Sequence, residues 1–153
     1  MSDNSRIPEA GFPFNHRLEL QIRFNDIDMF GHLNNSVYLQ FFDLGKMNYF
    51  NTVLGQDFIK SGLYVVIVNI NCNFYSPTLI NEKLEVLTAV TEIGYKSLTL
   101  EQRIVNKATG DVKCIAQTIM AGFDPSTMKS APIPEQPCKL MEKYEGRNLI
   151  KVK

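Results

Sequence analysis

Residues 35–50 read NSVYLQFFDLGKMNYF, and they decide the fold because they predict one helix that is apolar around most of its circumference. Val37, Phe41 and Leu44 recur at helical spacing along one side. A second apolar row, which includes Tyr38, repeats that spacing beside the first. A helix with so wide an apolar surface must be mostly buried. In a chain of this size, a sheet that curls around the helix can bury it.

The other segments read as strands joined by short loops. Residues 16–24 alternate apolar and polar side chains, as a half-buried strand does. Strand-like runs follow the helix at 66–74, 83–93, 96–106 and 112–124. The connections are too short for crossover helices, which predicts an antiparallel sheet. The expected class is α+β, a hotdog fold in which one long helix is wrapped by a curved antiparallel sheet of about five strands.

Such a sheet has long exposed edges, which natural proteins usually hide. We therefore expect the chain to pair with a second copy of itself. The asparagines at 69, 71 and 73 are unusual in a strand, and we expect them to face an interface or water. Residues 1–15 read as a lead-in, 16–135 as the domain and 136–153 as a C-terminal tail with a short polar helical segment.

The bulk properties exclude several classes of function. The chain has 153 residues, and its 16 basic and 16 acidic side chains cancel. A neutral chain lacks the broad positive field that nucleic-acid binding needs. The three cysteines show no metal-binding or redox spacing and read as free thiols in a reducing compartment. We find no signal peptide and no apolar run long enough to span a membrane, so we expect no membrane association and a cytoplasmic location.

The segment NDIDMFGHLNN, residues 25–35, carries the candidate chemistry. Asn34 is a suitable N-cap for the helix, and its side chain would satisfy the N–H of one of the next residues. The N–H of Asn35 would then remain free at the positive end of the helix dipole, where it can receive the oxygen of a polarised carbonyl. Asp28 lies close by in sequence, whereas we expect Asp26 to brace the loop by accepting backbone N–H groups.

A carboxylate beside an oxyanion site suits a substrate with a good leaving group. A thiol has a pKa of about 8.5, so a thiolate leaves without a strong general acid. Thioester hydrolysis needs a base or nucleophile on one side and an oxyanion donor on the other. No Ser-His-Asp or Cys-His arrangement is visible in the sequence.

Residues 23–43, RFNDIDMFGHLNNSVYLQFFD, resemble the signature of the hotdog thioesterases related to 4-hydroxybenzoyl-CoA thioesterase. The resemblance covers most of residues 16–135. It implies that Asp28 is the catalytic aspartate, acting either as a nucleophile or as a base on water. It also implies that the Asn35 N–H polarises the thioester carbonyl and that Tyr38 shapes the acyl pocket. Homodimers with the site between subunits, which often pair into tetramers, are implied as well.

Other site residues follow from the same resemblance. Gly31 belongs to the motif, and His32 is a candidate substrate contact. Lys96 and Ser97 resemble a strand segment that contacts the CoA nucleotide, although Gly94 and Tyr95 stand where relatives carry arginines. Lys129 resembles a further basic position near the nucleotide. CoA is part of the substrate, and we expect no metal and no redox cofactor.

Three alternatives remain open at this stage. An acyl carrier protein could deliver the acyl group in place of CoA. The chain could also bind acyl-CoA without hydrolysing it. A hotdog dehydratase fits less well, because the predicted helix carries no histidine.

Overall fold

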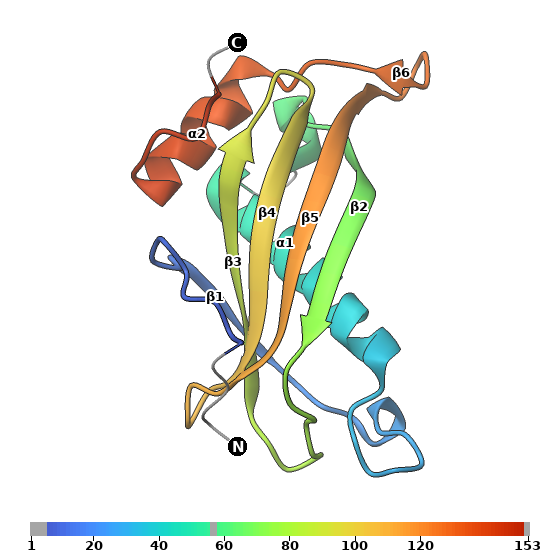
Figure 1. Cartoon of the computed structure of the whole chain (residues 1–153). Coiled ribbons are helices and arrows are strands. Elements are labelled where there is room, and N and C mark those ends of the chain that lie inside the picture. The colour runs from blue at the N-terminus through green and yellow to red at the C-terminus, as the bar shows by residue number, and fades with distance from the viewer. Residues whose placement is uncertain (1–5, 56–57, 152–153) are drawn as a thin grey trace.

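The computed structural model describes residues 6–55 and 58–151, in which one long helix lies against one face of a curved antiparallel sheet (Figure 1). The elements in chain order are β1 (His16–Leu20), η1 (Phe24–Asp26), α1 (Asn35–Leu54), η2 (Phe58–Ser61), β2 (Val65–Phe74), β3 (Leu84–Ile93), β4 (Ser97–Asn106), β5 (Val112–Asp124), β6 (Lys129–Ser130) and α2 (Glu135–Glu145). The sheet order is β1-β3-β4-β5-β2, with the short β6 paired to β5. The α+β hotdog expectation is confirmed.

The first strand is shorter than its alternating pattern predicts. Pairing between β1 and β3 stops at Leu20 opposite Leu84, where β3 itself begins. Without a neighbouring strand, the chain turns at Phe24 into the 3-10 turn η1, and the Phe24 side chain is exposed. The difference follows from the length of the partner strand, which the alternation of residues 16–24 does not encode.

Helix α1 lies close against the sheet at Gly45. A methyl group added there would lie 2.9 Å from Val86 Cγ1 and 2.9 Å from Gln102 Nε2. The Gln102 amide is buried and donates to the backbone oxygen of Phe42 and to Oγ1 of Thr88, each at 2.9 Å. Glycine therefore allows the helix to lie on β3 and β4 at this point.

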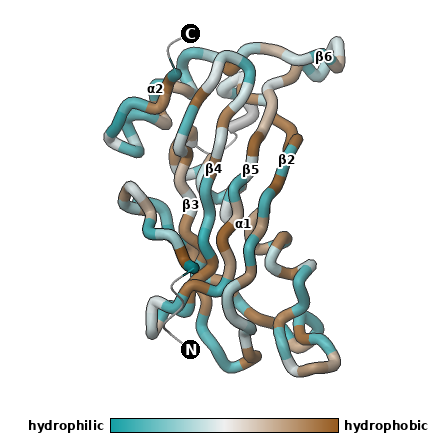
Figure 2. Tube along the Cα trace, viewed as in Figure 1, coloured by the Kyte–Doolittle hydropathy of each residue, from teal (hydrophilic) through white to brown (hydrophobic). Residues whose placement is uncertain are grey.

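Strand β2 forms one edge of the sheet and is unusually exposed. Eight of its ten residues are exposed, and its N-terminal part is hydrophobic, as the brown colour in Figure 2 shows. The exposed apolar side chains of β2 are Val66, Ile67, Val68, Ile70 and Phe74. On α1, Leu39, Leu44 and Met47 are exposed as well. The edge strand of a monomeric soluble protein usually exposes less apolar surface than this.

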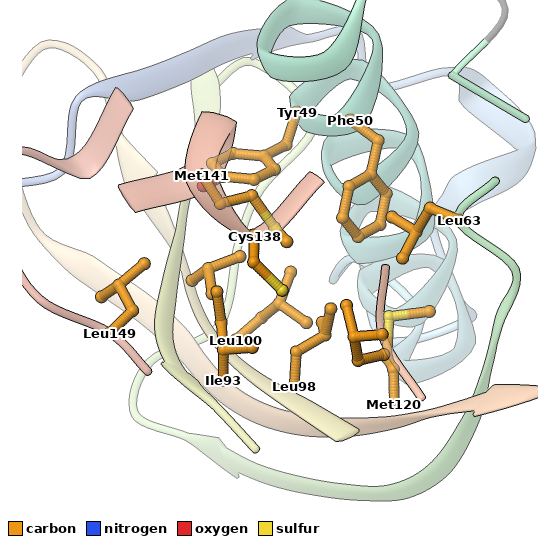
Figure 3. Packing of buried hydrophobic residues seen from close by; sticks show 12 residues of the cluster. Tyr49, Phe50, Leu63, Ile93, Leu98, Leu100, Met120, Cys138, Met141 and Leu149 are labelled. Carbon is orange, nitrogen blue, oxygen red and sulfur yellow. The ribbon is translucent and has the colours of Figure 1, made fainter. Parts of the chain in front are cut away.

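The core divides into two clusters along α1. The first half of the helix packs on β3, β4 and β5 through Val37, Phe41 and Phe42. The second half packs on β3 and β4 and is covered at its end by α2. Figure 3 shows Tyr49 of α1 and Met141 of α2 among the side chains of this second cluster.

Two further observations bear on the sequence-based expectations. Cys72, Cys114 and Cys138 are all free thiols; Cys114 and Cys138 are buried and Cys72 is half-buried. Across residues 6–55 and 58–151, we find no helix with the length and apolarity to cross a membrane.

Candidate active site

Helix α1 begins as the sequence predicts. The Asn34 side chain accepts a hydrogen bond from the backbone N–H of Ser36 at 3.0 Å, and Val37 N–H donates to the Asn34 backbone oxygen at 2.9 Å. The N–H of Asn35 has no hydrogen-bond partner among the described residues. It therefore lies unpaired at the first turn of a 20-residue helix, where the dipole favours negative charge.

The loop before the helix holds the Asp28 carboxylate by one oxygen only. Its Oδ1 accepts from the N–H groups of Phe30 at 2.9 Å and His32 at 3.2 Å. Gly31 has a φ of 81°, a conformation that favours glycine and lets the chain reverse around the carboxylate. Oδ2 has no hydrogen-bond partner in the described part of the chain.

Asp26 has the bracing role expected from the sequence. Its carboxylate is buried, and it accepts from the Arg23 backbone N–H at 2.8 Å and from the Arg23 guanidinium at 3.1 Å. Burial alone would raise the pKa of Asp26, but the hydrogen bonds and charge of Arg23 hold it below its ordinary value. Asn34 N–H also donates to the Asp26 backbone oxygen at 2.8 Å, which fixes the loop to the helix start.

Four of the predicted site residues line one cavity of about 300 Å³: Asp28, His32, Asn35 and Tyr38. Gly31 lies in the loop that forms its rim. The Tyr38 ring is buried and packs edge-on against Phe74, with 5.3 Å between ring centroids. Its hydroxyl lies 2.8 Å from Oγ1 of Thr78.

The opposite wall of the cavity comes from the end of β2 and the turn after it. Phe74, Tyr75, Ser76 and Pro77 line it. In the sequence, this segment indicates only the end of a strand. A turn that follows an edge strand carries no local signal of what it faces. The Leu33 N–H donates to the Thr78 backbone oxygen at 2.8 Å, and this long-range bond joins the loop before α1 to the turn after β2.

The arrangement supplies both groups that acyl transfer requires. Asp28, whose Oδ2 has no partner among the described residues, and Asn35, whose N–H is unpaired there, line the same cavity. A carbonyl between them would have its oxygen stabilised by the N–H and its carbon open to the carboxylate or to a water that the carboxylate activates.

The three predicted nucleotide contacts lie elsewhere in the chain. Lys96 and Ser97 are at the β3–β4 turn and Lys129 is in β6, at the end of the sheet opposite the Asp28 loop (Figure 1). The Lys96 ammonium donates to Ser130 Oγ at 3.4 Å, which places it beside β6. One chain therefore groups these residues with each other and does not bring them to the cavity.

Comparison with known proteins gives a consistent answer. The family model described as the thioesterase-like superfamily matches residues 22–141. The long-chain acyl-CoA thioesterase FadM of Escherichia coli is 26% identical over 128 residues, which cover 83% of this chain and 95% of the relative. The acyl-CoA thioester hydrolase YbgC of Escherichia coli is 24% identical over 121 residues, 78% of this chain and 90% of the relative.

A solved structure extends the comparison to three dimensions. A thioesterase from Thermus thermophilus, crystallised with coenzyme A and zinc, superposes with a TM-score of 0.79 at 25% identity. The superposition covers 89% of this chain and 98% of that chain. The residues that the family model matches, 22–141, contain the Asp28 loop, α1 and all the long strands of the sheet.

Proposed function

The chain belongs to the thioesterase-like superfamily, and from this premise and the geometry of the Asp28 cavity we propose that it hydrolyses acyl-CoA thioesters to a carboxylic acid and free CoA. The relatives FadM and YbgC, both named for acyl-CoA thioester hydrolysis, support the reaction. The observation that carries the proposal is that Asp28 and Asn35 line one cavity, and that Oδ2 of Asp28 and the Asn35 N–H have no hydrogen-bond partners in the described residues.

The chemistry follows from these two groups. The thioester oxygen accepts from the Asn35 N–H, which draws electron density from the carbonyl carbon. Asp28 then either attacks that carbon and expels the CoA thiolate, leaving an acyl-aspartyl anhydride for water to cleave, or removes a proton from a water that attacks. Both routes consume one water and release the acid and the thiol. Tyr38 and Phe74 form the wall against which the reacting group lies.

We further propose that two chains form a dimer through β2, with each site completed at the interface. The exposed apolar edge supports this pairing, because an unpaired strand of such length is a site of association. Antiparallel pairing of two β2 strands would place the start of one beside the end of the other. The partner's Lys96, Ser97 and Lys129, which lie far from Asp28 within one chain, would move toward the Asp28 end and reach the CoA phosphates. The exposed apolar residues of α1 could support further pairing into a tetramer.

The free cysteines fit a reducing compartment, so we place the reaction in the cytoplasm. Sedimentation of the purified protein would test the dimer. Val68→Lys introduces a charge at the most exposed apolar position of β2 and should shift the protein toward monomer. If the wild-type protein sediments as a monomer at micromolar concentration, the shared site is wrong.

The decisive experiment replaces Asp28 by asparagine, which keeps the side-chain shape and removes the nucleophile or base. Released thiol is measured on a panel of acyl-CoAs, with mass spectrometry of the released acids. We expect a loss in turnover of at least about a hundredfold. Asp111→Asn, in the β4–β5 hairpin, is the matched control and should match the wild-type rate. Wild-type turnover by Asp28→Asn on every hydrolysed substrate would remove Asp28 from the mechanism.

The same assay separates the remaining alternatives. An acyl-CoA binder would retain intact thioester through the incubation, whereas the hydrolase releases free thiol. Presenting one acyl group on CoA and on an acyl carrier protein distinguishes the two donors by their kcat/KM values. A faster reaction with the carrier form would transfer the proposal to that substrate class.

A further inference from the structure

Lys46 occupies a position in α1 where the helix pattern calls for an apolar residue. It belongs to the buried side of the helix, between Phe42 and Phe50. Its side chain is only 5% exposed. Lysine is rarely buried unless its ammonium group has a partner. Burial lowers the pKa of Lys46, while the nearby Asp43 carboxylate raises it, and burial dominates.

The ammonium group of Lys46 is only partly satisfied. Its Nζ lies 3.3 Å from Oδ1 of Asp43, three residues earlier on α1, and the Asp43 carboxylate is 66% exposed. An ammonium group has three N–H donors. In residues 6–55 and 58–151, the Lys46 ammonium group donates to Asp43 alone, so two of its N–H donors have no acceptor there.

Lys46 lines a second cavity, of about 400 Å³, between α1 and the start of β2. Besides Lys46 and Asp43, its walls are mainly apolar: Met47 and Phe50 from the helix, Leu63 and residues 64–67 at the start of β2, and Met120 and Phe123 from β5. A cavity that is apolar except for one ion pair suits an acyl group better than a nucleotide.

The position of this cavity relates it to the Asp28 site. Lys46 lies 11 residues beyond Asn35 on the same helix, a distance of about 16 Å along the axis. The two cavities use opposite ends of β2, namely Val65–Ile67 and Phe74. Antiparallel pairing of two β2 strands would bring the Lys46 cavity of one chain toward the Asp28 cavity of its partner.

We propose that the Lys46 cavity receives the acyl group and selects acyl chains that carry an uncharged acceptor oxygen, a hydroxyl or a keto group, over plain alkyl chains. The inference rests on the proposed hydrolysis of acyl-CoA. A bare alkyl chain would displace water from the ammonium group and leave its donors unsatisfied in an apolar space. An acceptor oxygen restores that hydrogen bond. Because Asp43 already provides one negative charge, a neutral acceptor fits better than a second carboxylate.

The experiment compares matched acyl-CoAs that differ only at the chain end. Hexanoyl, decanoyl and tetradecanoyl thioesters are each paired with the ω-hydroxy and the ω-carboxy form. We expect the wild-type protein to prefer the hydroxy member over the alkyl member by about tenfold or more in kcat/KM at the length that reaches Lys46. Lys46→Met, of similar length but without donors, should abolish that preference by improving the reaction with the alkyl member.

Lys139→Met is the matched control, because it makes the same chemical change at an exposed lysine of α2 and should keep the wild-type ratio. A wild-type preference for the alkyl member at every length, or an unchanged ratio in Lys46→Met, would overturn the proposal. A preference for the carboxy member that depends on Lys46 would overturn the choice of a neutral acceptor. The wild-type ratios alone already test the idea if the Lys46 variant does not fold.

A binding measurement distinguishes an error in the proposed role of the Lys46 cavity from an error in the proposed hydrolysis. Thioether analogues of the alkyl and hydroxy CoA pairs cannot be hydrolysed, and their dissociation constants are measured by calorimetry. If no thioester is cleaved, the proposed hydrolysis is wrong. The Kd ratio of the two thioethers then still shows whether the Lys46 cavity prefers the hydroxy chain over the alkyl chain. If both thioesters are cleaved equally and both thioethers bind equally, the hydrolysis stands and the role of Lys46 is wrong.

Discussion

The hydroxyl of Tyr49 donates a 2.6 Å hydrogen bond to Oε2 of Glu145, and this bond joins the long helix α1 to the C-terminal helix α2. Both side chains are buried. The same carboxylate oxygen accepts from the Val90 N–H of β3 at 3.3 Å, and Arg147 lies 3.6 Å from Oε1. One carboxylate therefore ties α2 to the helix and to the sheet at the end of the molecule remote from Asp28.

Removing the Tyr49 hydroxyl should destabilise the protein without changing its activity. Tyr49→Phe leaves the buried Glu145 carboxylate without its shortest hydrogen bond, which should lower the free energy of unfolding by about 1–3 kcal/mol. Urea denaturation followed by circular dichroism measures the change. Tyr144→Phe is the control, since that hydroxyl donates to the Asn15 backbone oxygen at an exposed site and should matter less. If the two variants lowered the free energy of unfolding equally, the buried Tyr49–Glu145 hydrogen bond would stabilise the protein no more than the exposed one.

His16 should give the protein a measurable dependence of stability on pH. Its Nε2 lies 2.8 Å from Oδ1 of Asn48, its Nδ1 is buried without a partner in the described chain, and the ring packs edge-on against Tyr49. Burial lowers the pKa of His16 below 6.5, more than the Asn48 contact raises it. The unfolded chain then binds a proton that the folded chain does not. Stability should fall as the pH drops below about 6.5, and should level off below the folded pKa.

Urea denaturation at a series of pH values checks this slope. His16→Gln retains hydrogen-bonding capacity toward Asn48 and removes the titration, so the loss of stability that His16 causes below about pH 6.5 should disappear. Glu145 contributes a pH dependence of stability of the opposite sign to that of His16. Burial raises its pKa above 4.5, so its contribution is present at low pH and is lost as the pH rises from 4.5 through the raised value. An unchanged acid slope in His16→Gln would assign the slope to other groups.

Gly45 should be one of the few helical glycines at which alanine is harmful. Alanine usually stabilises a helix interior by about 1 kcal/mol relative to glycine. Here the added methyl would lie 2.9 Å from Val86 Cγ1 and from Gln102 Nε2, and it would disturb the amide that bonds Phe42 and Thr88. We expect Gly45→Ala to lower stability by about 1–3 kcal/mol. Gln40→Ala on the exposed side of α1 is the control, and a stabilised Gly45→Ala would show that the helix can move away from the sheet.

Single residues show which features of the fold and of the candidate site the sequence predicts. Asn34 caps α1 as predicted, because capping depends on local chemistry alone. Asp28 and Asn35 meet in one cavity for the same reason, since the loop between them is short. The burial of Lys46 is a feature that the local sequence does not predict. The ion pair of Lys46 with Asp43, three residues earlier on the helix, is a local contact, but the pattern does not show that the lysine is buried, because its burial depends on contacts with strands that follow the helix in the chain.

The wall from Phe74 to Pro77 and the buried Glu145 could not be predicted for a related reason. Each is placed by contacts between distant parts of the chain, such as Leu33 with Thr78 and Tyr49 with Glu145. The sequence around residues 139–145 indicates a polar helix, and α2 is mostly polar. Its few inward side chains nevertheless close the core.

Tyr38 and Thr78 should act as one unit that positions the cavity wall. The Tyr38 hydroxyl lies 2.8 Å from Thr78 Oγ1, both groups are buried, and the Thr78 backbone oxygen accepts from the Leu33 N–H of the Asp28 loop. Since the Tyr38 hydroxyl already has a partner, we expect it to brace the site and not to contact the thioester. Tyr38→Phe and Thr78→Val should each lower kcat by about two- to tenfold.

The double variant distinguishes a brace from a direct contact with substrate. If the two hydroxyls act only through each other, Tyr38→Phe combined with Thr78→Val should lose no more activity than the worse single variant, because the second change removes a group that has already lost its partner. The kcat values of all four proteins, measured by thiol release, give this comparison. A Tyr38→Phe variant far less active than Thr78→Val would instead mean that the phenol meets the thioester directly. Tyr38 would then join Asp28 and the Asn35 N–H in the reaction itself.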